Sequence, residues 1–152
     1  MVQTDKNAEI INDLIKINND RIEGYKTAAK ETSNADADLK ITFSEMESQS
    51  IRYKQELSNL VQKMGEEPEQ GTRIDGKIYR AWMDVKATFS GNSRKSVLEN
   101  CEFGEDAAQK AYKTALDSDG ELSSEARMLV LQQQQALKVS HDLIKRMRDQ
   151  TK

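Results

Sequence analysis

The chain has 152 residues, of which 32% are charged and only 5% aromatic, with one proline and a formal net charge of −3. This length suits a single domain with an ordinary hydrophobic core, and the composition favours long helices over a β-sandwich or barrel. The acidic balance argues against a nucleic-acid-binding surface, and no apolar run approaches the roughly 20 residues that cross a bilayer, so we expect neither partner.

The first half of the chain predicts a helical hairpin. Apolar residues recur at three- and four-residue steps over residues 4–32 and again over 37–64, the pattern of helices with one buried face. The short segment 33–36 is rich in turn-forming residues. Gly65 is expected to end the second helix, because glycine is common directly after a helix terminus.

The second half predicts another hairpin after a longer connection. Within that connection, Trp82 and its apolar neighbours recur at helical spacing, which predicts a short extra helix over residues 74–89. We expect Trp82 to anchor this helix on the rest of the protein. Two long helices then follow over residues 93–117 and 124–149, joined by another turn-prone segment.

The connection lengths predict how these helices assemble. Short connections within each half imply antiparallel neighbours, and one long connection between the halves can carry the chain back along the molecule. A bundle with one long crossover is the ferritin-like arrangement. The sequence therefore predicts an all-α, ferritin-like antiparallel four-helix bundle, formed by residues 1–152 as one domain.

The two hairpins have the pattern of an internal repeat. The tetrapeptide 25–28 recurs 87 residues later as 112–115, with the sequence Tyr-Lys-Thr-Ala in both places. The same offset pairs apolar positions that belong to the predicted faces of both hairpins: Ile11 with Leu98, Leu14 with Cys101, Phe43 with Val130, and Leu57 with Ile144. We interpret the two halves as copies of one ancestral hairpin.

Polar residues on or beside the apolar faces indicate where a functional centre would lie. Buried polar groups need hydrogen-bonding partners, so such residues either form a layer that sets the helix register or line a site. We predict a polar core layer of Asn18, Ser50, Lys54, Glu105, Gln133, Lys138 and Ser140.

Three segments together resemble a known family. Residues 17–25, 79–86 and 101–108 are similar to a bacterial ferritin-like four-helix-bundle family catalogued as a domain of unknown function. The likeness extends over roughly residues 8–149. It implies the fold and no particular activity.

The wider ferritin-like superfamily implies a test for metal binding. Its di-iron members take one Glu from each of two helices and a Glu-x-x-His motif from each of the other two. Superposition puts these six positions at Asn18, Ile51, Lys54, Glu105, Lys138 and His141. Only Glu105 and His141 keep a suitable ligand, because a charged lysine has no free lone pair. We therefore expect no cofactor, with iron or manganese as the alternative.

Two hypotheses concern the chemistry around Glu105. The first is that Lys54 or Lys138 supplies positive charge beside this carboxylate, where the metal would have been. The second, a minority alternative, is a nucleophilic pair of Cys101 and His141. A free cysteine is more often a small buried hydrophobe.

The missing ligand set favours a non-enzymatic bundle that acts through protein association, of which a homodimer is one form. The superfamily likeness implies a stress-related role. One cysteine and no visible signal peptide favour the cytoplasm. One alternative is a metal-binding oxidoreductase or storage protein that uses Glu105, His141, Glu102 and Glu47. Another is a small-ligand carrier with an apolar cavity near Trp82 or Tyr112.

Overall fold

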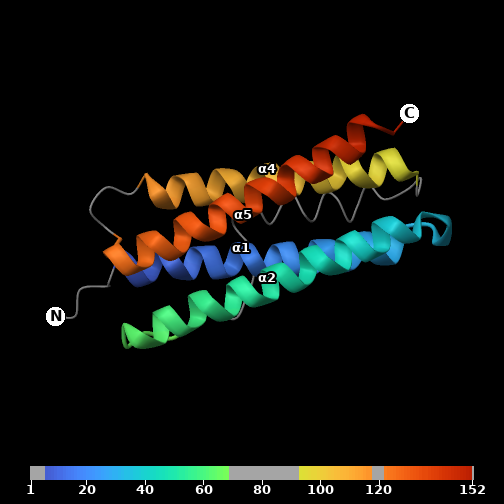
Figure 1. The fold of residues 1–152 in the computed structure, drawn as a ribbon. Helices are drawn as coiled ribbons and strands as arrows, with labels where there is room; N and C mark the ends of the chain where they lie inside the picture. Colours follow the sequence, from blue (N-terminus) through green and yellow to red (C-terminus); the bar gives the residue numbers. More distant parts are fainter. Residues whose placement is uncertain (1–5, 69–92, 118–121, 152) are drawn as a thin grey trace.

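The computed structural model describes residues 6–68, 93–117 and 122–151, and it contains no strand in these ranges. Four long helices dominate (Figure 1). Their bounds are α1 Lys6–Glu31, α2 Ala37–Lys63, α4 Arg94–Leu116 and α5 Ser124–Asp149, with a short 3-10 turn, η1 Asn34–Asp36, between the first two. The all-α four-helix fold is confirmed, and each helix end lies within two residues of its predicted position. The predicted helix 74–89, including Trp82, lies outside the described residues.

Serine side chains cap the N-termini of the two helices of the second hairpin, α4 and α5. The Ser93 hydroxyl accepts a hydrogen bond from the Ser96 backbone N–H at 3.1 Å, and the Ser123 hydroxyl accepts one from Ala126 at the same distance. Each serine thereby satisfies one of the backbone donors that a helix leaves unpaired in its first turn. These two caps account locally for where α4 and α5 start.

Gly65 ends α2 as predicted. Its φ of +79° lies in the left-handed region, which glycine adopts without steric cost. The backbone N–H of Glu66 donates to the Val61 carbonyl at 3.2 Å, and that of Gly65 donates to Gln62 at 3.0 Å. This pair of bonds is a Schellman motif, which satisfies two carbonyls at the helix end.

The helices run up, down, down and up. Helices α2 and α4 begin at the same end of the bundle (Figure 1), where Arg94 forms ion pairs with Asp36 at 3.3 Å and Asp38 at 2.7 Å. Helix α2 therefore ends at the opposite end of the bundle from the start of α4. Most of the connection between them, residues 69–92, lies outside the described ranges.

The core lies between the two hairpins. Helix α1 packs along α2, α4 packs along α5, and the hairpins meet chiefly through α1 and α4. The apolar positions paired by the repeat are buried in both halves: Ile11, Leu14, Phe43, Leu57, Leu98, Cys101, Val130 and Ile144. Equivalent residues of the repeat thus occupy equivalent positions in the core.

None of the described helices is long and apolar enough to cross a membrane.

The middle of α1 is enclosed on several sides at once. Four consecutive polar residues, Asn18, Asn19, Asp20 and Arg21, are all buried. Consecutive residues on a helix point in different directions, about 100° apart, so this burial extends beyond the stripe that faces α2 and α4. The enclosed stretch places polar side chains in the centre of the bundle.

Candidate functional site

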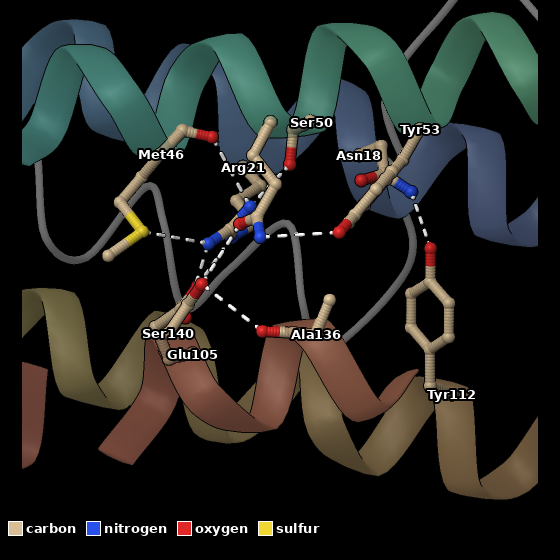
Figure 2. A network of polar contacts seen from close by, with 10 residues as sticks. Asn18, Arg21, Met46, Ser50, Tyr53, Glu105, Tyr112, Ala136 and Ser140 are labelled. Carbon is tan, nitrogen blue, oxygen red and sulfur yellow. Dashed lines mark hydrogen bonds and ion pairs between the residues drawn. The ribbon is translucent and has the colours of Figure 1, made fainter. Parts of the chain in front are cut away.

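A buried ion pair occupies the centre of the bundle (Figure 2). Arg21 on α1 donates from Nε to Glu105 Oε1 on α4 at 2.5 Å, and from Nη2 to Glu105 Oε2 at 3.3 Å. Both side chains are almost fully buried, at 0% and 1% exposure. The two parallel bonds match the flat fork of a guanidinium to the two carboxylate oxygens, and they join the two hairpins.

The other donors of Arg21 are also bonded. Nη1 donates to Ser50 Oγ at 2.8 Å and to the Met46 carbonyl oxygen at 3.3 Å, while Nη2 contacts Met46 Sδ at 3.4 Å. The guanidinium carbon lies 5.1 Å from the centre of the Tyr25 ring, within cation–π range. One side chain from α1 therefore contacts α2 and α4 together.

Burial keeps the groups beside the ion pair neutral. Burial lowers the pKa of Arg21, but the Glu105 carboxylate more than offsets this, and the net pKa is raised. Burial, followed by the negative charge of Glu105, raises the pKa of the Tyr25 hydroxyl and of the Cys101 thiol well above their ordinary values. A reactive cysteine needs a lowered pKa, so Cys101 is not set up as a nucleophile.

A second chain of hydrogen bonds links all four helices. Asn18 Nδ2 on α1 donates to Tyr112 Oη on α4 at 2.8 Å, and Tyr112 Oη donates to Gln133 Oε1 on α5 at 2.7 Å. Gln133 Nε2 then donates to Glu56 Oε1 on α2 at 3.0 Å. The first three side chains are buried, so this chain ties the helices together inside the core.

A third set of contacts joins α5 to α2. Ser140 Oγ donates to Gln49 Oε1 at 3.0 Å, and Gln49 Nε2 donates to Tyr53 Oη at 3.3 Å. Ser140 and Tyr53 are drawn near Arg21 in Figure 2. Together the three networks form a polar layer across the middle of the bundle.

The predicted polar core layer is found only in part. Five of its members are buried in the bundle: Asn18, Ser50, Glu105, Gln133 and Ser140. Lys54 is only half-buried, and Lys138 is 63% exposed and pairs with Asp142 at 2.8 Å. Neither lysine forms an ion pair with Glu105, so the hypothesis of a lysine beside this carboxylate is wrong.

Arg21 is the residue of this polar centre that sequence reasoning missed. It lies on the same face of α1 as Asn18 and Tyr25, and that spacing was the available signal. An arginine is easier to desolvate than a lysine ammonium, and its fork satisfies both carboxylate oxygens. This is the physical reason why an arginine, rather than either lysine, occupies the position beside Glu105.

Three of the four candidate metal ligands, Glu105, Glu102 and His141, contact different charged partners. Glu102 pairs with Arg148 at 2.7 Å. His141 contacts Asp106 through Nε2 at 2.5 Å and Asp142 through Nδ1 at 3.0 Å. Glu47 lies half-buried on α2. Within the described part of the chain, no three His, Cys, Asp or Glu side chains converge as a metal site would require. The described side chains therefore do not form the set of carboxylates and imidazoles that a di-iron centre of this fold uses.

The fold and the centre define a class: an all-α four-helix bundle whose polar core is built around an arginine–glutamate pair. The sequence model of the family described as "Domain of unknown function (DUF2383)" matches residues 6–118. This match covers more than half of the chain, which therefore belongs to that family. No curated protein matches the sequence. The family description assigns no activity, so the function has to be argued from the site.

Proposed function

We propose that this protein is a ferritin-like bundle without a di-metal centre, which acts by protein association rather than by catalysis. The observation that carries the proposal is the position of Arg21. Its guanidinium lies beside Glu105 in the middle of the bundle, where a ferritin-like enzyme would hold metal. A cation of the chain itself balances the carboxylate and uses its lone pairs.

The ferritin-like part of the proposal rests on topology and on the repeat. The up-down-down-up order with one long crossover is the ferritin-like connectivity. Asn18 and Glu105, which are equivalent in the repeat, both lie in the polar centre. A stress-related role enters the proposal only through this likeness, and a cytoplasmic setting suits a chain whose cysteine is free and buried.

The association part rests on exposed apolar side chains of α2 and α5. Single exposed apolar residues are ordinary, but these lie on two neighbouring helices whose mutual contact is sparse. The side chains are Ile41, Ile51, Met128, Leu131 and Val139, each at least 43% exposed. We propose a second copy of the same chain as the partner, because the commonest soluble assembly is a two-fold dimer.

Metal content tests the absence of a metal centre. The protein is purified without chelator and incubated with Fe(II), Mn(II) or Zn(II), and retained metal is measured by mass spectrometry. Glu105→Ala and His141→Ala are measured alongside. We expect no retained metal in any of the three proteins. Near-stoichiometric metal that is lost in both variants would replace the proposal with the metal-binding oxidoreductase or storage alternative.

Sedimentation velocity tests the association. We expect the wild-type chain to dimerise with increasing concentration, and the double variant Met128→Lys/Val139→Lys to remain monomeric with unchanged helical circular dichroism. The matched control is Gln132→Lys/Gln135→Lys, which adds the same charge at exposed polar positions of the same helix. A wild-type chain that stays monomeric at all concentrations contradicts the dimer.

A further inference from the structure

We infer that the centre of the bundle is a binding pocket for a planar organic cation, which the chain fills with its own Arg21 guanidinium. The inference rests on the proposed absence of a metal centre and adds a ligand class. The residues around the guanidinium form a preformed site, and the group that fills this site is part of the side chain of Arg21 on α1.

The contacts around the guanidinium match a flat ion. Glu105 meets one edge with both carboxylate oxygens, at 2.5 and 3.3 Å, and Ser50 Oγ and the Met46 carbonyl meet another edge, at 2.8 and 3.3 Å. The Tyr25 ring covers a face of the ion, with its centre 5.1 Å away. Acceptors at the edges and an aromatic ring over a face are the two ways in which proteins bind guanidinium groups.

The same contacts are poorly suited to a metal ion. Among the described groups that contact the guanidinium, only Glu105 carries negative charge. Ser50 and the Met46 backbone supply neutral oxygens, and Met46 also supplies a thioether. Iron and manganese centres of this fold take several carboxylates with imidazole, and thioethers suit softer ions. The pocket therefore favours a monovalent, delocalised cation over a divalent metal.

Removing the arginine side chain should leave this pocket empty, with the buried Glu105 carboxyl no longer balanced by a counter-ion. A buried carboxylate without a counter-ion is strongly unfavourable, so the pocket should take up a cation of the right shape. Arg21→Ala deletes the atoms of ethylguanidinium, which is therefore the matched probe. Ethylammonium has the charge without the flat fork, and ethylurea has the flat shape without the charge.

Thermal unfolding of Arg21→Ala with each probe at millimolar concentration and constant ionic strength tests the inference. We expect ethylguanidinium to raise Tm by about 3–6 °C at ten times its dissociation constant. Ethylammonium, ethylurea, Mn(II) and Zn(II) should raise it by much less. If Arg21→Ala does not fold alone, the readout becomes the recovery of helical circular dichroism when each probe is added.

Two control variants separate the pocket from general effects. The double variant Arg21→Ala/Glu105→Gln should lose the ethylguanidinium response, because the pocket no longer carries charge. Arg94→Ala should show no response, because that arginine binds Asp38 at a surface where its side chain is 32% exposed. Equal stabilisation by ethylurea, a response that survives in the double variant, or preference for a metal ion overturns the inference.

The outcomes are distinguishable from those of the proposed function. Metal retained by the wild-type protein would contradict the proposed bundle without metal. Failure of ethylguanidinium to stabilise Arg21→Ala would contradict only the pocket and would leave the ion pair as a structural contact.

Discussion

At the scale of single residues, the Arg21–Glu105 pair decides the character of the core. A buried ion pair is weak evidence for stability by itself, because desolvation of two charges offsets much of their attraction. Removing one partner is different, since the other charge is then left buried and unbalanced. Each of the two side chains is therefore required for stability as long as the other one is present.

A double-mutant cycle tests this dependence. We expect Arg21→Met and Glu105→Leu each to lower the free energy of unfolding by about 3–5 kcal/mol, and the double variant to recover most of that loss. Urea denaturation followed by circular dichroism measures the four proteins. Strictly additive losses would mean that the two side chains are not coupled.

His141 predicts how stability depends on pH. Burial lowers the pKa of this imidazole, but hydrogen bonds to Asp142 and Asp106, with the nearby Glu105 charge, raise it above its ordinary value overall. A raised pKa in the folded state favours the charged form. This contribution is therefore complete below the unfolded pKa of about 6.5 and is lost as pH rises through the folded value.

The single histidine makes this prediction easy to measure. We expect an NMR titration of the imidazole of His141 to show a midpoint above that of an unfolded peptide, and Asp106→Asn to lower that midpoint. In His141→Gln, the loss of stability above about pH 6.5 should disappear. A midpoint at or below the peptide value would contradict the contacts of His141 with the two aspartates.

The residues of the centre show what sequence reasoning can and cannot find. Asn18, Glu105 and Gln133 are predictable because polar side chains stand out on an apolar stripe. Arg21 is harder to predict. Its spacing places it on the face of Asn18 and Tyr25, but a long charged side chain near a stripe is expected to keep its charged end in water. Only the three-dimensional approach of α4 shows that its end is enclosed and paired.

At the scale of elements, helix ends are the most predictable feature. Gly65 lies where the periodic pattern stops, and serines cap α4 and α5. These are local signals that hold whatever the tertiary structure is. The helix predicted over 74–89 stays a prediction, since it lies outside the described residues.

Gly65 gives a prediction that depends on backbone conformation alone. A Cβ added at this position would meet no atom within 4 Å, so side-chain crowding is not the reason for glycine. We expect Gly65→Ala to lower the free energy of unfolding by about 1 kcal/mol because of its positive φ. Gly65→Asn should cost less, since asparagine tolerates this region better. Chemical denaturation measures both, and a stabilising alanine would contradict the argument.

At the scale of the whole molecule, the chain of hydrogen bonds through Tyr112 connects four helices with one hydroxyl at its centre. We expect Tyr112→Phe to cost about 1–3 kcal/mol, because Asn18 and Gln133 each lose a buried partner. Tyr53→Phe is the matched control. The Tyr53 hydroxyl accepts a longer hydrogen bond, at 3.3 Å from Gln49 Nε2. Its removal should therefore lower the free energy of unfolding by less. Equal costs in denaturation experiments would argue against a special role for the Tyr112 chain.

The composition of the central pair also sets which hairpins can pair with each other. Arg21 comes from the first hairpin and Glu105 from the second. In the repeat, Arg21 is equivalent to Ala108, and Glu105 is equivalent to Asn18, so neither charge has a charged equivalent in the other hairpin. Two copies of the first hairpin would place two Arg21 guanidiniums together without Glu105, and two copies of the second would place two Glu105 carboxylates together. Although the halves are alike in packing, charge at the centre therefore favours pairing of a first hairpin with a second one.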